Sequence, residues 1–439
     1  MNFKYLIVGG GVAGTTAAET IRANDSNGSI AIITDEPHPL YSRVMLSKPS
    51  FLLEKTPKTN VWLKTDDWYK NNCIEYFSGK TVTALDLAAK TVTIDGGEVF
   101  GFEKLLLAVG AHARRWNILG ADKKGIYYLR TLDEAKEIAA AMKTAKRAVV
   151  IGSSCIAFEA IENLRSAGIE VTEVMLEKYF WEPMLDEEGG RIVEEVLTDA
   201  GVKIFRQSET KEVIGGKNVE GIITKNGEKI ACDMILCGIG VVYPVEFVKA
   251  AGIKVNHGIV VNEYLETSAP GVWAAGDVAE FNDVVLQEQC MAGNWMNAHE
   301  QGRIAALNMT ASFDKPLGRE PLGAELGAEV LGAERLRIKK EQFKLVSFYT
   351  SHGFGLNIAF GGDIRVLPGR TTISRGSAES ARHARLILRG GQIVGVAMVN
   401  RIFELGTIVK LIENRTDVSA KQKKLSDPNF DLKILMQSY

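Results

Sequence analysis

YLIVGGGVAG, residues 5–14, is the stretch that decides the fold we expect of this chain. Its first four residues are apolar and indicate a buried strand, and glycines spaced G-x-G-x-x-G follow them. In this spacing Gly9 permits a tight turn from strand to helix, Gly11 lets a pyrophosphate approach the backbone, and Gly14 allows helix and strand to pack closely. The helix that begins here offers free N–H groups and a positive dipole end to phosphates. The stretch therefore predicts a dinucleotide site, to which Val12 and Ala13 also contribute.

The predicted helix ends near Arg22, and a second strand is expected over residues 30–33. Asp35 and Glu36 follow this strand, about 20 residues beyond the glycines, where an acidic side chain binds a ribose. We therefore expect Asp35, or Glu36 beside it, to accept hydrogen bonds from the adenosine ribose. A glycine-rich turn without a ligand is the alternative, and the strand, helix and acid in their proper order argue against it.

Composition and charge exclude several classes of protein. A length of 439 residues and a hydrophobic content of 46% predict two or three domains with packed cores. The net charge is -2 and basic residues are scattered among acidic ones, so we expect no nucleic-acid partner. The five cysteines contain no C-x-x-C motif, which argues against a dithiol or zinc site. No signal peptide precedes the first strand and no apolar run reaches the roughly 18 residues of a membrane span, so we expect a cytoplasmic protein.

A second βαβ unit is expected after residue 147. It is predicted to contain, in order, a strand over 148–151, a helix over 157–166 and a strand over 170–176. Its loop keeps Gly152 but has Ser154 and Ala157 in place of the second and third glycines. Alanine is tolerated at the third position, whereas serine at the second narrows the approach of a phosphate without closing it.

The acid of this second unit is also displaced. Met175 stands at the strand end where a ribose-binding acid is expected, and Glu177 two residues later is able to replace it. We expect a second dinucleotide to be bound by Gly152, Ser154, Ile156 and Glu177. A nucleotide fold that has lost its ligand is the alternative.

Two cations, Arg43 and Lys48, follow the first unit in an irregular segment with prolines. Arg43 is suited to a pyrophosphate and Lys48 to an electron-rich ring, and two exposed surface cations are the alternative reading. Further along, a short apolar run ends in Gly276-Asp277, which can place a carboxylate against the sugar chain of a cofactor.

The last part of the chain changes character. Residues 316–336 repeat Leu-Gly-Ala-Glu and predict an inserted linker or surface loop. Residues 340–439 predict a separate α+β domain. Its expected elements are strands over 344–349 and 356–360, a hairpin over 384–399 and a helix over 402–413.

Four motifs carry a resemblance to a known family: Y-x-R-x-x-L-S-K at 41–48, L-R-T-L-D at 129–133, W-A-A-G-D at 273–277 and W-x-x-A-x-x-Q-G at 295–302. With the two nucleotide units, the chain resembles the FAD-dependent pyridine-nucleotide reductases. The nearest branch contains ferredoxin, rubredoxin and putidaredoxin reductases, apoptosis-inducing factor and the reductase part of NAD(P)H nitrite reductase. The resemblance covers nearly everything except residues 316–336.

This resemblance implies an α/β fold with FAD on a first Rossmann-like domain, NAD(P)H on a second, and a C-terminal α+β interface domain. The implied domains are an FAD-binding domain over 1–115 and 244–315, an NAD(P)-binding domain over 116–243, the insert over 316–336 and the C-terminal domain over 337–439.

The resemblance also implies roles for single residues. Lys48 matches the lysine beside flavin N5, and Glu159 matches the acid that pairs with it. Asp277 matches the aspartate on the ribityl chain, Trp295 an aromatic residue near the isoalloxazine, and Arg43 a cation near the phosphates. The remaining implied FAD contacts are Val82, Ala108, Gly110, Arg130 and Gly276.

The function implied is transfer of a hydride from NAD(P)H to FAD and of electrons onward to a small protein such as ferredoxin or rubredoxin. The disulfide branches carry a redox cysteine in the segment that is here 43–48, and its absence argues against a disulfide reductase. Met175 and Glu177 lack an arginine pair for a 2′-phosphate, so NADH is favoured. The alternative is an FAD-containing electron-transfer subunit or redox sensor with a degenerate nicotinamide site. A homodimer is one possible assembly.

Overall fold

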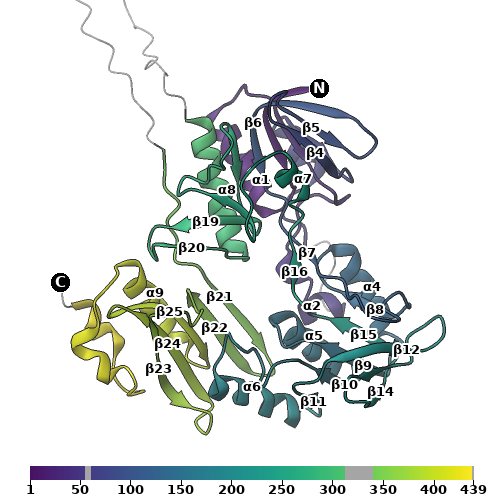
Figure 1. Cartoon of the computed structure of the whole chain (residues 1–439), viewed down its shortest axis with the longest axis vertical. Coiled ribbons are helices and arrows are strands. Elements are labelled where there is room, and N and C mark those ends of the chain that lie inside the picture. Colours follow the sequence, from purple (N-terminus) through teal and green to yellow (C-terminus); the bar gives the residue numbers. More distant parts are fainter. Residues whose placement is uncertain (55–60, 312–339, 438–439) are drawn as a thin grey trace, which may run out of the picture.

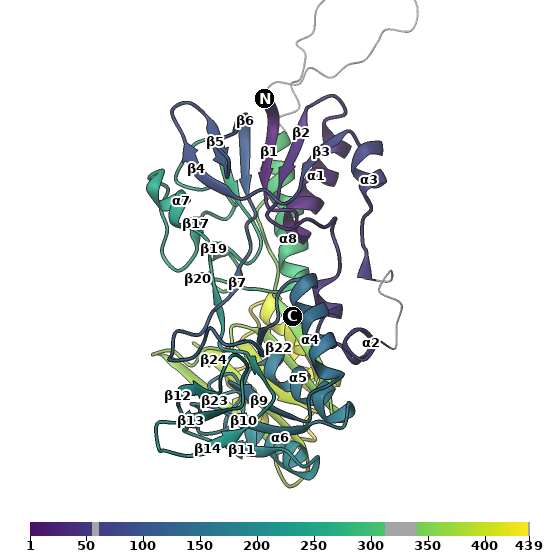
Figure 2. The ribbon, with the colours of Figure 1, turned by 90° about the vertical axis from the view of Figure 1, so that its right-hand side faces the viewer.

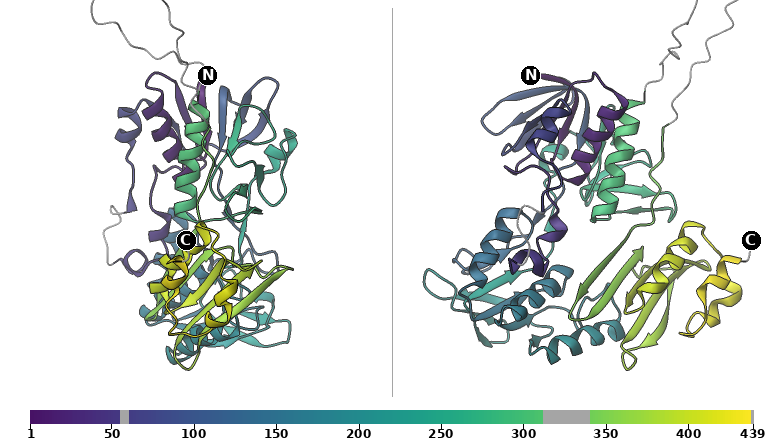
Figure 3. Two further views of the ribbon diagram at one scale, coloured as in Figure 1. Left: turned by 90° about the vertical axis from the view of Figure 1, so that its left-hand side faces the viewer. Right: turned by 180° about the vertical axis from the view of Figure 1, so that it is seen from behind.

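The computed structural model describes residues 1–54, 61–311 and 340–437, so the predicted insert at 316–336 lies outside the described residues. Within these ranges the chain forms three parts, each with a principal sheet of its own. Figure 1 places the N-terminal sheet at the top, a second sheet at the lower right and the C-terminal sheet at the lower left, and Figure 3 gives the same arrangement from behind. Two α/β parts followed by a C-terminal sheet confirm the predicted fold class. Among the described residues no helix has the length and apolar character of a membrane span.

The N-terminal part is centred on a mixed sheet. Its strands are β1 (Asn2–Val8), β2 (Ile30–Ile33), β3 (Ile74–Phe77), β4 (Val82–Asp86), β5 (Thr91–Ile94), β6 (Val99–Leu107) and β18 (Val272–Ala274). β1 lies between β2 and β6, and all three run parallel. β18 pairs with the end of β6, so a late segment of the chain completes the sheet begun at the N-terminus.

Helices α1 (Val12–Asn24) and α8 (Trp295–Thr310) lie side by side against this sheet (Figures 1 and 2). A Cβ added to Gly302 would lie 2.3 Å from the backbone oxygen of Ala13. The glycine that ends the 295–302 motif is therefore required for the close contact of the two helices. The smaller elements here are α3 (Asp66–Asn71), α7 (Glu246–Ala250), β17 (Ile259–Val261), β19 (Ala279–Asp283) and β20 (Glu288–Cys290).

The second part is a parallel sheet flanked by helices. Its strands in spatial order are β11 (Lys203–Phe205), β10 (Glu170–Val174), β9 (Arg147–Ile151), β15 (Met234–Cys237) and β8 (Ile126–Tyr128). Its helices are α4 (Leu132–Met142), α5 (Cys155–Ser166) and α6 (Glu187–Asp199). A small antiparallel sheet beside it consists of β12 (Thr210–Ile214), β13 (Gly221–Thr224) and β14 (Lys229–Ala231).

Within the described ranges, two connections join the first and second parts. The antiparallel pair β7 (His112–Ala113) and β16 (Val241–Val242) carries the chain out and back, close to the boundaries predicted at residues 115 and 243. Helix α2 (Pro49–Leu52) leaves the N-terminal part and packs against α4 and α5. Lys48 caps α2, so the packing of this short helix fixes the position of that lysine against the second part.

The C-terminal part is an antiparallel sheet carrying helix α9 (Leu405–Glu413). Its strands in spatial order are β21 (Phe348–Gly353), β22 (Leu356–Gly362), β25 (Gln392–Val399), β24 (Arg382–Arg389) and β23 (Arg370–Ser377). The hairpin predicted over 384–399 is confirmed by β24 and β25. Apolar residues of one face of this sheet belong to the same core as α5 and α6, which joins the second and third parts.

Several predicted element ends were wrong, for local reasons. The strand expected over 344–349 starts only at Phe348, because the residues before it are bound to the N-terminal part, with Asn294 donating to the Ser347 hydroxyl. That strand then runs through polar residues to Gly353, because β22 supplies its backbone partners. The second-unit strand ends at Val174 and its helix starts at Cys155. The last predicted helix starts at Leu405.

One core position in β10 is unusual. Glu173 is fully buried, and neither of its carboxyl oxygens has a hydrogen-bond partner among the described residues. Burial, reinforced by Glu194 and Glu177, raises the pKa of Glu173 well above its usual range, and Arg206 opposes the shift. Burial therefore favours the uncharged form of the carboxyl at this core position.

This burial predicts a stability that falls as pH rises. The unfolded chain releases the Glu173 proton near the usual pKa while the folded chain keeps it, so the free energy of unfolding declines by up to about 1.4 kcal/mol per pH unit until the raised pKa is reached. Glu173→Gln removes this decline. Urea unfolding at about pH 5 and about pH 8 should give the variant an advantage that grows with pH. Glu170→Gln, at an exposed position of the same strand, is the control, and equal behaviour of the two variants would contradict the prediction.

Candidate functional site

In the glycine turn after β1, two positions must be glycine because a side chain there would clash with the backbone. Gly9 has a φ of +114°, and a Cβ there would lie 2.1 Å from the Ala108 backbone oxygen. A Cβ on Gly14 would lie 1.9 Å from the Gly9 backbone oxygen. Both positions follow the roles predicted for a tight turn and a close helix–strand contact.

Gly11 is different. Its φ of -73° suits any residue, and a Cβ there would meet no atom of the described residues within 4 Å. Gly11 is the N-cap of α1 and has no side chain to cap the free N–H groups of the first turn. The turn therefore presents unpaired N–H groups to open space, which fits a bound pyrophosphate.

A pocket adjoins this turn. It is lined by Gly10, Gly11, Thr34, Glu36, His38, Pro39, Leu40, Tyr41, Arg43 and Tyr76. Thr34 and Glu36 both line it, on the segment that bends directly after β2. Asp35, the first choice from the sequence, points elsewhere: its half-exposed carboxylate lies 3.7 Å from His112. Of the two acids, Glu36 is the one that lines this pocket.

Glu36 also organises the loop that follows it. Its carboxylate accepts hydrogen bonds from the Tyr41 hydroxyl and the Arg43 guanidinium. Burial raises the pKa of Tyr41, so its hydroxyl stays protonated and also accepts from the Leu132 backbone N–H at 3.0 Å. Arg43 donates to the Arg130 backbone oxygen at 3.0 Å. The loop thus ties the pocket to the start of α4.

Asp277 and Arg130 meet across the first two parts. The Arg130 guanidinium donates to the Asp277 carboxylate at 2.9 Å and to the Ala111 backbone oxygen at 2.9 Å. The Gly276 backbone N–H donates to the buried side chain of Gln301 at 2.8 Å, which fixes the turn that carries Asp277. Gln301 was not predicted to have this role, although it belongs to the 295–302 motif. Its position in that motif, directly before Gly302, was the only sequence signal for this role.

Lys48 and Glu159 form the ion pair that the resemblance implied. The Lys48 ammonium lies 2.6 Å from Oε1 of Glu159, and the Glu159 side chain is buried. Oε2 of Glu159 accepts from the Ser47 hydroxyl. Asn163, one turn later on α5, donates to the Ser47 backbone oxygen at 2.8 Å. Helix α5 therefore holds both the carboxylate and the backbone from which Lys48 extends.

The other predicted contacts of the first unit lie on several different elements. Ala108 directly follows β6 and faces Gly9. Gly110 has a φ of +64° and lies beside the Arg130 guanidinium. Trp295 is the first residue of α8, half exposed, and its ring stacks on that of His299 with 5.2 Å between centroids. Val82 begins β4 and is buried.

In the second glycine loop, Ser154 has a helix-capping role that was not predicted from the sequence. The Ser154 hydroxyl caps α5 by accepting from the Ala157 backbone N–H at 3.3 Å. Gly152 keeps its tight turn, with a φ of +97° and a Cβ position 2.7 Å from the Gly238 backbone oxygen. Ile156 lies in the first turn of α5. Glu177 follows β10 and has a buried oxygen, Oε2, without a partner among the described residues, which fits an absent sugar hydroxyl.

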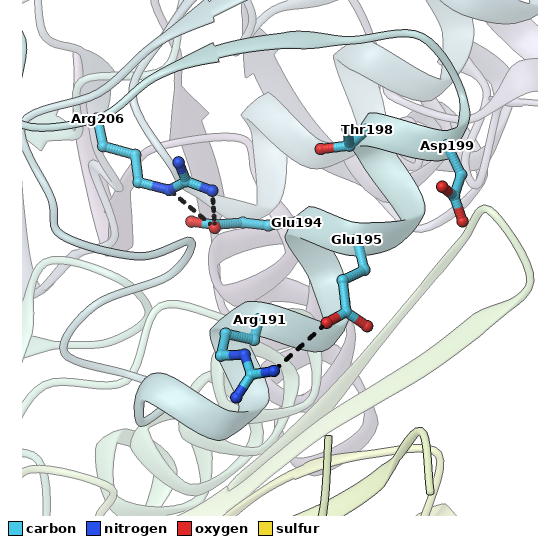
Figure 4. Close-up of a pocket in the computed structure, with 6 residues that line it drawn as sticks. All are labelled: Arg191, Glu194, Glu195, Thr198, Asp199 and Arg206. Atoms are coloured by element: carbon cyan, nitrogen blue, oxygen red, sulfur yellow. Dashed lines mark hydrogen bonds and ion pairs between the residues drawn. The ribbon is translucent and has the colours of Figure 1, made fainter. Parts of the chain in front are cut away.

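A separate hollow on the outer face of α6 carries none of the predicted residues. It is lined by Arg191, Glu194, Glu195, Thr198, Asp199 and Arg206 (Figure 4). Its arginines are paired, Arg206 with Glu194 at 2.8 Å and Arg191 with Glu195 at 3.7 Å. Because both arginines are already paired with glutamates, we assign the hollow no function.

Residues 3–302 match the model of the pyridine nucleotide-disulphide oxidoreductase family, and residues 351–436 match the reductase C-terminal domain. The chain belongs to the pyridine nucleotide-disulphide oxidoreductase family. Proteins of this family use FAD and NAD(P)H. Cys155 is the thiol beside the Lys48–Glu159 pair, and burial, aided by Glu159, raises its pKa to about 12. A thiolate is therefore not available there near neutral pH.

Among curated relatives, the biphenyl dioxygenase ferredoxin–NAD(+) reductase component of Paraburkholderia xenovorans is 28% identical over 98% of this chain and 98% of its own length. Rubredoxin-NAD(+) reductase of Pseudomonas putida is 30% identical over 69% of this chain and 78% of its own length. Nitrite reductase [NAD(P)H] of Bacillus subtilis is 28% identical over 96% of this chain, which spans only 48% of that relative.

Solved structures agree on the fold. The ferredoxin reductase for the CYP199A2 system of Rhodopseudomonas palustris is 25% identical, with a TM-score of 0.84 over 98% of this chain and 99% of that one. The reductase–putidaredoxin complex gives a TM-score of 0.85 at 24% identity over 99% of this chain and 98% of that one.

The open space at Gly11 predicts that a substitution there will prevent flavin binding without preventing folding. Gly11→Val should fold, because its backbone angles and surroundings accept a side chain, yet it should purify without flavin because the side chain fills the space for a pyrophosphate. Circular dichroism and the flavin absorption spectrum check this. Gly216→Val, at a glycine with equally open surroundings, is the control. A yellow Gly11→Val protein would contradict the prediction.

Proposed function

We propose that this chain is an FAD-dependent NAD(P)H oxidoreductase that delivers electrons to a small electron-transfer protein such as a ferredoxin or rubredoxin. The observation that carries the proposal is the Lys48–Glu159 pair, which brings a cation from the first dinucleotide unit against the second unit. The names of the relatives and the absence of a cysteine at residues 43–48 support a protein acceptor over a disulfide.

Residues of the first unit would hold FAD. The N-terminus of α1 at Gly11 would bind the pyrophosphate, Glu36 the adenosine ribose, and Asp277 with Arg130 the ribityl chain. When bound, FAD supplies the redox chemistry by taking a hydride from NAD(P)H and releasing electrons singly.

Lys48 would act on the ring electrostatically. Its ammonium has three N–H donors, and the pairing with Glu159 fixes its position. Glu159 is buried and the Lys48 side chain is only partly exposed, so a cation there would interact with added negative charge more strongly than it would in bulk water. Lys48 would thus favour the reduced cofactor electrostatically, without the participation of a thiolate.

Glu177 and the loop at Gly152 would bind the nicotinamide nucleotide. A carboxylate at the end of β10 accepts hydrogen bonds from a ribose diol and repels a 2′-phosphate. Oε2 of Glu177, which is buried and has no hydrogen-bond partner in the described part of the chain, supports NADH as the reductant.

A second candidate is an FAD-containing electron-transfer subunit of a larger complex. It is favoured by the 28% identity to the epsilon subunit of NADH-dependent phenylglyoxylate dehydrogenase of Aromatoleum evansii, over 95% of this chain and 93% of that protein. We further propose a cytoplasmic protein, supported by its free cysteines, with a homodimer as one possible assembly.

Anaerobic stopped-flow reduction tests the choice of coenzyme. The wild-type holoenzyme should be reduced by NADH at least about tenfold more efficiently than by NADPH, because the Glu177 carboxylate repels the additional phosphate. Glu177→Gln should narrow that ratio mainly by improving NADPH binding. Oxidation of the reduced protein by ferredoxins and rubredoxins then screens for the acceptor. A flavin that neither nucleotide reduces would contradict the proposed enzyme and favour the subunit alternative.

Lys48→Met tests the role of the cation. The variant should retain FAD, because the pyrophosphate and ribose contacts remain, while reduction by NADH slows by about 10- to 100-fold. Lys64→Met is the matched control, since Lys64 is also ion-paired in the N-terminal part, at 3.0 Å from Glu19. Equal rates for Lys48→Met and wild type would remove Lys48 from the mechanism.

A further inference from the structure

The C-terminal sheet reaches the Lys48–Glu159 pair through one side chain. Ser351 lies in β21, is fully buried, and donates its hydroxyl to Oε1 of Glu159 at 3.1 Å. None of the sequence motifs includes it. The same oxygen of Glu159 accepts a hydrogen bond from the Lys48 ammonium at 2.6 Å. One carboxylate oxygen therefore joins a lysine of the first part to a serine of the third.

A buried carboxylate needs several donors to remain stable away from water. The Ser47 hydroxyl satisfies Oε2, and Lys48 and Ser351 share Oε1. The lysine stem is flexible, whereas a serine on a strand holds its hydroxyl close to the backbone. Ser351 is therefore the donor that defines where Oε1 points.

The strand that carries Ser351 is docked rigidly onto α5. The Phe354 backbone N–H donates to Glu162 at 2.8 Å, one turn along the same helix. A Cβ added to Gly353 would lie 2.7 Å from the ring of Phe158, so strand and helix are in close contact. This docking leaves the Ser351 hydroxyl little room to move.

Cys155 is the other group within reach. Its sulfur lies 3.7 Å from Oε1 of Glu159 and 3.6 Å from the Ser351 hydroxyl oxygen. A thiol is a weaker donor than a hydroxyl, so it adds little to the orientation of the carboxylate.

We propose that Ser351 is a positioning residue for the Lys48–Glu159 pair, which makes the C-terminal sheet part of the electrostatic environment of the flavin. The proposal rests on the proposed function, because it assigns Ser351 an effect on the cation beside the bound ring. Without the hydroxyl, Glu159 turns and Lys48 is no longer held where it stabilises added negative charge.

The test uses FAD-loaded full-length protein. Ser351→Ala should shift the midpoint potential of the bound flavin to more negative values and slow its reduction by NADH about five- to tenfold, with the Kd for NADH unchanged. Ser351→Thr, which keeps the hydroxyl, should restore both quantities. Thr350→Val, on the exposed face of the same strand, is the control and should match wild type. If Ser351→Ala does not retain flavin, Ser351→Gly, which also removes the hydroxyl, is measured in its place.

A double-mutant cycle decides whether the effect passes through Glu159. In a Glu159→Gln background, Ser351→Ala should cause no further change in potential. A wild-type potential in Ser351→Ala, or an undiminished effect in the Glu159→Gln background, would overturn the proposal. If NADH does not reduce the wild-type flavin, the proposed function fails instead, and the potentials still report on Ser351.

Discussion

A buried carboxylate whose hydrogen-bond donors come from two other segments of the chain is the constraint on which this structure depends. Glu159 lies on α5 and accepts hydrogen bonds from Ser47 and Lys48 of the first part and from Ser351 of the third. Removing one partner of such a group leaves charge uncompensated away from water, which is costly. The pair therefore fixes how the three parts meet and, in the same contacts, holds a cation at the junction of the two nucleotide units.

The two glycine loops show how one local fold serves different needs. In the first loop Gly11 leaves the N-terminus of α1 open, and its free N–H groups have no side chain to cap them. In the second loop Ser154 caps α5 with its own hydroxyl. The first loop therefore leaves its N–H groups free for close contact with phosphate. In the second loop the Ser154 hydroxyl stabilises the helix but occupies one of the N–H groups that a phosphate would bind. This difference agrees with a resident cofactor in the first unit and an exchanging nucleotide in the second.

Much of the first dinucleotide unit could be predicted from the sequence, because its strand, turn and helix depend on local residue patterns. The strand, turn and helix at residues 5–14 follow from apolar and glycine spacing, and the Lys48–Glu159 pair, 111 residues apart, was reached only through motifs shared with a family. That Glu36 rather than Asp35 lines the pocket depends on how the chain bends after Ile33, which the residue pattern does not predict. Ser351 was missed because a lone serine in a polar strand gives no signal until the strand is docked on α5.

The most direct test of the central claim is a crystal structure of the FAD-bound protein. We expect the pyrophosphate to lie against the backbone of Gly11, and the Lys48 ammonium to lie between the flavin ring and a Glu159 carboxylate that still accepts a hydrogen bond from Ser351. A flavin bound elsewhere, or a Lys48 that turns to solvent with Glu159 unpaired, would contradict it.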